Sequence, residues 1–253
     1  MPAPKNPLKQ ALAECRVQTG IWVNLASPIA VDLLAGAGFD WLLLDGEHGP
    51  NTIPTLLTQA QVIGQRCNVV VRPPAGEVRM IKQILDLGVQ NVLVPMVDSV
   101  EQAQAMARAM RYPPAGVRGL GASVARAADY GRTPEYMANA DDEVCLILQV
   151  ESRAGLAALP GILAVDGVDG VFIGPSDLAA DMGFRGDTTH PDVLKAIEGA
   201  IAQITASGKA AGILTFDEAL ARRYRDMGVT FLGVGSDVNL LMRAAGGLAE
   251  RAR

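Results

Sequence analysis

The sequence predicts an α/β fold, a single (β/α)8 barrel, because eight strand-like runs alternate with helix-like segments along the chain. The chain has 253 residues and is 49% hydrophobic, which is enough for one barrel with a large core. No linker, low-complexity tract or change in composition divides it, so we expect residues 1–253 to form one domain.

The eight apolar runs have the composition of buried parallel strands. They do not alternate cleanly between apolar and polar residues, as expected where helices cover both faces of a sheet. In chain order the runs are GIWVNL (20–25), WLLLDGEHG (41–49), VVVRPP (69–74), NVLVPMV (91–97), VCLILQVES (144–152), GVFIGPSD (170–177), AAGILT (210–215) and FLGVGSD (231–237).

Segments with helical periodicity lie between these runs. The segment 191–207 carries an apolar stripe behind the N-cap candidates Thr188 and Thr189. The segments 77–87 and 217–227 are each followed by a glycine, which commonly stands just after a helix. A leading helix is expected before the first strand, with one face made of Leu8, Ala11, Leu12 and Cys15.

Three further features complete the predicted architecture. A helix over 98–111 follows an N-cap at Asp98 or Ser99, and a final helix covers about 238–252. The connection 112–143, rich in proline, glycine and arginine, predicts a long loop over one end of the barrel. A doubly wound sheet is the alternative, but it needs fewer strands or a GxGxxG turn after the first strand, and the sequence has none there.

Composition excludes several classes of protein. The net charge is −5 and the basic residues are scattered, so we expect no nucleic-acid partner. No apolar run is long enough to span a membrane, and the start MPAPKNPLKQ lacks the apolar stretch of a signal peptide. Cys15, Cys67 and Cys145 form no CxxC pair, which predicts reduced core thiols in a cytoplasmic protein.

Polar and ionisable residues follow most of the predicted strands. In (β/α)8 barrels the residues just past the carboxyl ends of the strands converge on the active site. Here these positions hold Asn24, Asp45, Glu47, His48, Arg72, Gln149, Glu151, Asp177, Thr215, Ser236 and Asp237. We therefore expect them to share one pocket, although Asp45 could only cap its turn and a loop histidine such as His48 or His190 could only be solvated.

Two carboxylates and an arginine carry the strongest chemical signal. Glu151 and Asp177 end neighbouring strands, where they repel one another unless a cation or a proton lies between them. Carboxylate oxygens suit Mg²⁺ or Mn²⁺, whereas the structural alternative is a salt bridge to Arg153 or Arg185. Arg72 ends a buried strand and needs an anionic partner there.

The lysines argue against Schiff-base chemistry. The five of them, none at the carboxyl end of a predicted strand, are Lys5, Lys9, Lys82, Lys195 and Lys209. An amine nucleophile for a carbonyl substrate is therefore missing from the expected pocket. A carbanion formed in this barrel would need a metal ion to stabilise it.

Several sequence blocks resemble a known family. "GFDWLLLDGEHGPN", "VVVRPP", "RYPPAGVRG", "QVESRAG" and "DGVDGVFIGPSDLAADMG" are similar to blocks of the metal-dependent hydroxy-ketoacid (pyruvate) aldolases. These enzymes belong to the phosphoenolpyruvate/pyruvate superfamily of TIM barrels, and the likeness spans residues 8–250. The nearest group acts on 4-hydroxy-2-oxoheptane-1,7-dioate, and aldolases of 2-keto-3-deoxyglucarate and 2-keto-3-deoxyrhamnonate share the same blocks.

The resemblance implies a reaction and its requirements. It implies reversible retro-aldol cleavage of a 4-hydroxy-2-ketoacid to pyruvate and an aldehyde such as succinic semialdehyde, through a pyruvate enolate. The cofactor would be Mg²⁺, Mn²⁺ or Co²⁺, with no organic cofactor. The partners would be these small molecules and further copies of the chain, arranged as a hexamer with an exchanged C-terminal helix.

The resemblance also assigns residues. By family match, Glu151 and Asp177 hold the metal, Arg72 stabilises the enolate and His48 shuttles the proton. Asp45 matches a polar contact beside the metal waters. The substrate-binding positions are Trp22, Gln149, Gly174, Ser176, Asp177 and Leu214, where Ser176 replaces a common alanine but uses its backbone N–H. Thr215 and Phe216 differ from the relatives near the aldehyde pocket, which leaves the preferred aldehyde open.

Asp86 is explained only by the resemblance. A carboxylate in the last turn of a helix is unfavourable by roughly 0.3–1 kcal/mol, and this helix end lies away from its own active site. By family match, Asp86 would pair with the catalytic histidine of a neighbouring subunit, whereas the plain alternative is a solvated surface residue.

Two other functional classes remain as alternatives. A phosphoenolpyruvate or acyl-CoA lyase would use the same carboxylates, but it needs a phosphate or CoA site, for which only "GVGSD" is a weak candidate. A non-catalytic barrel would bind a carboxylate without turnover, yet no expected catalytic residue is missing.

Overall fold

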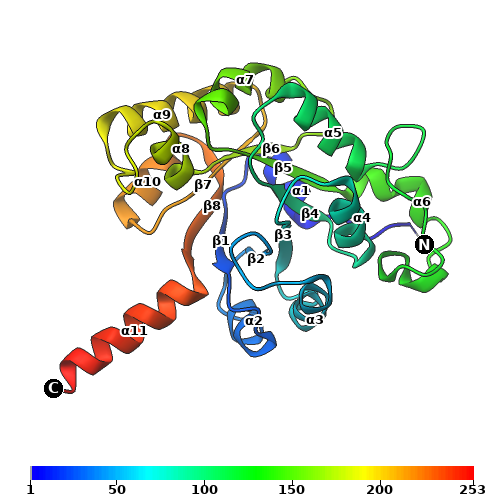
Figure 1. Ribbon diagram of the computed structural model, residues 1–253. Coiled ribbons are helices and arrows are strands. Elements are labelled where there is room, and N and C mark those ends of the chain that lie inside the picture. The colour runs from blue at the N-terminus through cyan, green and yellow to red at the C-terminus, as the bar shows by residue number, and fades with distance from the viewer. Residues whose placement is uncertain (1) are drawn as a thin grey trace.

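The computed structural model describes residues 2–253 and is a closed barrel of eight parallel strands (Figure 1). The strands pair in chain order, and the last pairs with the first, which confirms the predicted (β/α)8 barrel. Their bounds are β1 Gln18–Val23, β2 Trp41–Asp45, β3 Asn68–Arg72, β4 Asn91–Val94, β5 Cys145–Val150, β6 Gly170–Ile173, β7 Ala210–Leu214 and β8 Val229–Ser236.

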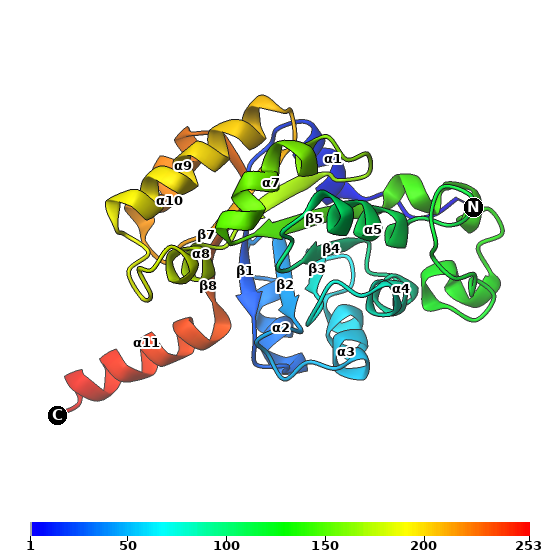
Figure 2. The ribbon, with the colours of Figure 1, turned by 45° about the horizontal axis from the view of Figure 1, so that its top comes forward.

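Helices connect the strands and surround most of the barrel (Figures 1 and 2). The α-helices are α1 Pro7–Ala13, α2 Pro28–Ala35, α3 Ile53–Ile63, α4 Val78–Asp86, α5 Val100–Met110, α6 Tyr136–Asn139, α7 Arg153–Leu163, α8 Pro175–Asp181, α9 Pro191–Ala206, α10 Glu218–Asp226 and α11 Asp237–Arg251. Two 3-10 helices, η1 Arg126–Gly131 and η2 Ala140–Glu143, lie in the long connection before β5.

The helix caps confirm one expectation and correct another. Ser99 caps α5, as predicted, by accepting a hydrogen bond from the backbone N–H of Gln102. The cap of α9 is His190 and not the predicted Thr188 or Thr189. Proline suits the first position of a helix, so Pro191 fixes the residue before it as the cap.

Aromatic side chains fill the interior of the barrel. Trp41 stacks on Phe231 with ring centroids 4.1 Å apart, and Trp22 meets both Trp41 and Phe172. Gly20 faces the Trp41 ring so closely that a side chain there would overlap it. The interior is therefore a packed core rather than a channel, and the site can lie only at its ends.

The amino-terminal segment closes the end of the barrel at which the strands begin. Leu8 and Leu12 of α1 pack against the interior residues. Asn6 donates to the side chain of Asn91 (2.8 Å), and its backbone N–H donates to Glu143 (2.9 Å). The long connection covers the same end, since the Asn139 side chain accepts from the backbone N–H of Ala3.

The cysteines are distributed differently from the prediction. Cys145 is a buried core thiol, as expected, but Cys67 is only partly buried and Cys15 is exposed. Helix α1 ends at Ala13, and Cys15 follows in a left-handed turn with φ of 55°. The helical stripe therefore stops at Leu12, so the prediction of three core thiols is wrong.

The last helix, α11, leaves the barrel (Figures 1 and 2). Its main contacts are with β1 and β8, and its outer part extends away from the other elements. Large apolar side chains are exposed on this helix and on α2, namely Ile29, Leu33, Leu240, Leu241, Met242 and Leu248. Among residues 2–253, no helix is both long and apolar enough to cross a lipid bilayer.

Candidate active site

A cavity of about 560 Å³ lies at the carboxyl ends of the strands. Its walls come from many strand ends and from the segments that follow them. The predicted site residues that line it are Trp22, Asp45, His48, Arg72, Gln149, Glu151, Gly174, Ser176, Asp177 and Leu214. Asp86 is the one residue with an assigned role that lies outside the cavity. Of the strand-end residues expected to share the pocket, Glu47 and Asp237 do not line it, and the Asp237 carboxylate instead accepts from the backbone N–H groups of Asn24 and Leu25.

Asp45 and Arg72 form a bidentate ion pair in the wall of this cavity. The strand register places them side by side, and Arg72 donates to the Asp45 carboxylate from Nε (2.9 Å) and from Nη2 (2.7 Å). Asn24 donates to the same carboxylate (2.7 Å). Burial alone would raise the pKa of Asp45, but Arg72 lowers it below its usual value, so this acid is ionised and holds the guanidinium in place.

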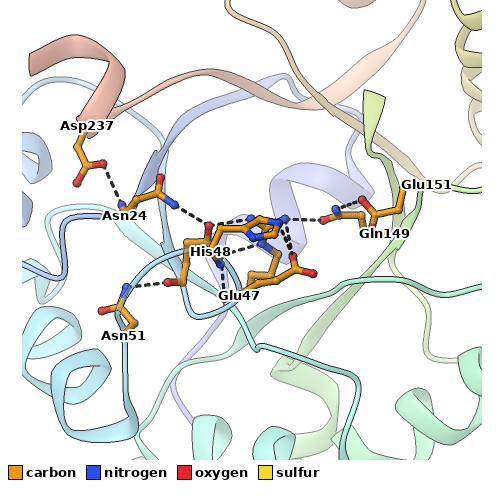
Figure 3. A network of polar contacts seen from close by, with 9 residues as sticks. Asn24, Glu47, His48, Asn51, Gln149, Glu151 and Asp237 are labelled. Atoms are coloured by element: carbon orange, nitrogen blue, oxygen red, sulfur yellow. Dashed lines mark hydrogen bonds and ion pairs between the residues drawn. The ribbon is translucent and has the colours of Figure 1, made fainter. Parts of the chain in front are cut away.

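Glu47 forms an ion pair with Arg72 and lies near His48 (Figure 3 labels Glu47 and His48). Its Oε2 lies 2.8 Å from Arg72 Nη1 and 3.8 Å from His48 Nε2. The His48 side chain is 67% exposed and reaches over the cavity, so it can exchange protons with a bound molecule. Burial raises the pKa of Glu47, although the neighbouring Arg72 and His48 lower it.

Glu151 is buried beside the arginine and is held by neutral donors. Gln149 Nε2 makes a short hydrogen bond to its carboxylate, and the backbone N–H of Met96 donates at 3.0 Å. Gln149 in turn accepts from Arg72 (3.4 Å). Burial raises the pKa of Glu151, and the negative charges of Asp177 and Glu47 raise it further. An acid in such surroundings is suited to binding a cation.

The salt-bridge alternative for the two carboxylates is not what the structure shows. Arg153 pairs with Asp181 (3.1 Å) instead of Glu151 or Asp177. The side chain of Asp177 makes no hydrogen bond or ion pair with another residue in the range 2–253. A buried acid and a free acid therefore face one cavity without a cation to neutralise them both.

These two residues fit a hard divalent cation. Within residues 2–253 no group of three or more His, Cys, Asp or Glu side chains is placed to hold a metal ion, so a cation at this position would have Glu151 and Asp177 as its protein ligands and take its other ligands from water or substrate. Mg²⁺ binds in this way, through one or two carboxylates together with waters and substrate oxygens. Gly174 supports the fit, because a methyl group at this position would overlap the Glu151 carboxylate.

Gly174 also begins helix α8. No side chain caps this helix, so the backbone N–H groups of Ser176 and Asp177 in its first turn have no capping partner. Both residues line the cavity. Free N–H groups and the helix dipole together favour an anion at such a position. The arrangement suits a small anion such as a carboxylate.

Asp86 lies elsewhere, at the end of α4 and outside the cavity. It accepts a hydrogen bond from Arg118 Nη2 (3.1 Å), and Arg118 is fully buried against the Tyr112 ring. Asp86 is thus neither fully solvated nor part of its own active site.

The comparison with known families agrees with the geometry of the site. The family model for HpcH/HpaI aldolase/citrate lyase matches residues 18–244. The chain belongs to this family. The sequence-based recognition of an aldolase family is therefore confirmed, and the protein is an enzyme of the carbon–carbon lyase class.

Individual relatives cover nearly the whole chain. It is 54% identical to the hydroxypyruvate/pyruvate aldolase of Roseovarius nubinhibens, over 97% of this chain and 96% of that protein. It is 52% identical to the 4-hydroxy-2-oxo-heptane-1,7-dioate aldolase of Shigella boydii, over 98% and 95%. The crystal structure of an HpcH/HpaI aldolase/citrate lyase family protein from Burkholderia cenocepacia superposes with a TM-score of 0.95, at 37% identity over 98% and 100% of the two chains.

The cavity has further lining residues to which the sequence assigned no role in binding. Five of them come from the α8–α9 loop, from α10 and from α11, namely Thr188, Thr189, Leu220, Tyr224 and Arg243. None stands at a strand end, so the positional rule for barrels does not single them out.

We expect Gly174→Ala to weaken metal binding. The added methyl group would displace the Glu151 carboxylate, and changes beside a metal ligand typically cost about 10–100-fold in metal affinity. Mn²⁺ titration followed by electron paramagnetic resonance measures the effect. Gly199→Ala, in α9 with no atom near the new methyl group, is the matched control. Unchanged Mn²⁺ affinity in Gly174→Ala would contradict the assignment of Glu151 as a ligand.

Proposed function

We propose that the enzyme catalyses reversible retro-aldol cleavage of a 4-hydroxy-2-ketoacid to pyruvate and an aldehyde. With 4-hydroxy-2-oxoheptane-1,7-dioate the aldehyde is succinic semialdehyde. The observation that carries the proposal is the joint placement of Glu151, Asp177, Arg72 and His48 in one cavity. The names of close relatives support the same reaction.

Glu151 and Asp177 would hold a divalent cation such as Mg²⁺, Mn²⁺ or Co²⁺. When bound, the cation supplies Lewis-acid stabilisation of the negative charge that develops on the ketoacid oxygen. No organic cofactor is needed, because the bond between C3 and C4 breaks without a net redox change. The backbone N–H groups of Ser176 and Asp177 receive the substrate carboxylate.

Arg72 stabilises the enolate that forms as the bond breaks. Its guanidinium is fixed by Asp45 and Glu47, so it keeps its position while charge develops beside it. Gln149 is hydrogen-bonded to both Arg72 and Glu151 and so fixes the position of these two side chains relative to each other. Trp22 and Leu214 form apolar walls of the same cavity and exclude water from the reacting carbon atoms.

His48 acts on the hydroxyl group. In cleavage it takes the proton from the C4 hydroxyl as the aldehyde carbonyl forms, and in synthesis it returns that proton. Glu47 lies close enough to stabilise the resulting imidazolium, whereas the Asp45 carboxylate is occupied by Arg72 and by the backbone N–H groups of Glu47 and His48.

The reaction is tested by pyruvate release from a panel of 4-hydroxy-2-ketoacids. The panel includes the heptanedioate, 2-keto-3-deoxyglucarate and 2-keto-3-deoxyrhamnonate, with citryl-CoA as the substrate of a lyase-type alternative. Turnover of the ketoacids but not of the thioester supports the proposal. Turnover of the thioester alone, or binding of pyruvate with no turnover of any compound, contradicts it.

A second donor is favoured by one comparison. The relatives at 54% and 53% identity are named hydroxypyruvate/pyruvate aldolases. Hydroxypyruvate carries the same carboxylate and keto groups as pyruvate, and its extra hydroxyl lies on the carbon that becomes the nucleophile. Aldol synthesis with each donor and one common aldehyde compares the two directly.

We propose that the enzyme works in the cytoplasm as a homo-oligomer, by family resemblance a hexamer, in which α11 is exchanged between subunits. A groove beside α10 has Leu232 and Val234 of β8 and Ala221 of α10 among its lining residues. The exposed apolar residues of α11 match such a groove in character. A second copy of α11 would bury both surfaces, which favours association.

A mixing experiment tests whether the site is completed across subunits. We expect His48→Ala and Asp86→Asn to be weakly active alone and to recover activity when mixed under subunit exchange. Some interfaces would then pair an intact His48 with the partner subunit's intact Asp86. Two separately purified batches of His48→Ala, mixed in the same way, are the control. A fully active monomer at high dilution would rule out a shared site.

A further inference from the structure

The side chain of one arginine in the cavity wall is unpaired among residues 2–253. Arg243 lies in α11 and lines the active-site cavity, but its guanidinium forms no ion pair or hydrogen bond within this part of the chain. Arg72, the other arginine in the cavity wall, is held by Asp45 and Glu47. The guanidinium of Arg243 is therefore free to bind an anion that enters the cavity.

The cavity is larger than the reaction centre requires. Its volume of about 560 Å³ falls in the range of roughly 300–1,000 Å³ that is typical of sites for drug-sized ligands. Pyruvate alone is far smaller than such ligands. The space beyond the metal carboxylates is thus available to the aldehyde half of the substrate.

The walls contributed by neighbouring segments suit a short carbon chain that ends in a polar group. Leu214 and Phe216, at the end of β7 and just after it, provide apolar surface. Thr188, in the α8–α9 loop, has a hydroxyl without a hydrogen-bond partner among residues 2–253. Asp217 is the acid on this side, and it is engaged by capping α10 through the backbone N–H of Leu220 (2.8 Å).

We propose that Arg243, assisted by the Thr188 hydroxyl, forms a subsite for a carboxylate at the far end of the aldehyde half. The inference rests on the proposed aldolase function and names the residues that would bind the terminal carboxylate of a dioate substrate. A guanidinium binds a carboxylate through two parallel charge-assisted hydrogen bonds. An aldehyde acid gains this contact, whereas a neutral aldehyde of equal length does not.

The test compares two acceptors in aldol synthesis with pyruvate and the metal-loaded enzyme. Succinic semialdehyde carries the terminal carboxylate, and butanal has the same chain length without it. Arg243→Ala should lower kcat/KM about 10-fold for succinic semialdehyde, mainly through KM, because hydrogen bonds to charged groups are worth this much in partly exposed sites. Butanal should be unaffected, and Arg243→Lys should retain part of the preference.

Arg251→Ala is the matched control, since it removes the same charge from the same helix outside the cavity. Equal losses for both acceptors, or no loss for either, would overturn the subsite. A wild-type enzyme that joins pyruvate to neither acceptor would refute the proposed function itself. An active wild type whose acceptor preference is unchanged in Arg243→Ala would refute only the role of Arg243.

Discussion

Removal of divalent cations is expected to lower ketoacid cleavage by about 10²–10⁴-fold, because a bound cation typically contributes several kcal/mol to charge stabilisation. Mg²⁺, Mn²⁺ or Co²⁺ should restore the activity. The expectation follows from Glu151 and Asp177, two acids that face one cavity without a protein cation for both. Pyruvate release before and after chelation, and again after metal addition, measures the effect.

Variants locate the cation. Asp177→Ala should stay inactive when metal is added back, because one of the two protein ligands is missing. Asp181→Ala is the control on the same helix, since its carboxylate pairs with Arg153 and not with the cavity. Full activity in exhaustively chelated enzyme would exclude a metal-dependent mechanism.

His48→Ala and Arg72→Ala should differ in which reactions they damage. Oxaloacetate loses CO₂ to give the same enolate as aldol cleavage, but it has no C4 hydroxyl to deprotonate. His48→Ala should therefore lower cleavage by about 10²–10⁴-fold, the usual contribution of a general base, and spare much of the decarboxylation. Arg72→Ala should damage both reactions, because both pass through the enolate.

The Arg72 variant needs a check of folding. Asp45 is fully buried, and removal of its guanidinium partner leaves an unpaired buried charge, which typically costs about 3–5 kcal/mol of stability. Thermal unfolding identifies this loss, and Arg72→Lys, which keeps the charge, serves as the milder variant.

Equal losses in both reactions for His48→Ala, with metal still bound, would show that His48 serves the enolate instead.

The barrel and most of its site could be predicted because both follow from local patterns. Buried parallel strands are apolar throughout, and residues after their carboxyl ends converge, so Glu151 and Asp177 could be placed in one cavity from sequence alone. The predicted run for β8 starts at residue 231 because the polar Thr230 interrupts the apolar pattern, whereas the strand itself begins at Val229.

Other features depend on contacts that no local pattern specifies. The Asp86–Arg118 pair joins residues on two segments far apart in sequence, and nothing in either segment identifies the partner. Arg243 lines the cavity because α11 starts beside the cavity. The helix then extends away from the barrel, and no sequence pattern predicts that course. The exposed Cys15 shows the same limit, since an apolar stripe continues in sequence after the helix has ended.

Closure of the barrel sets the order in which the protein can acquire its structure on the ribosome. Strand β8 pairs with β1, and Asp237 accepts from the backbone N–H of Asn24, 213 positions earlier. At about 5–20 residues per second, synthesis exposes β1 roughly 10–40 s before its partner exists. Until then the nascent sheet has two unpaired edges, which are sites of aggregation. A chain released before Val229 would lack β8 and would have neither a closed core nor a complete active-site wall.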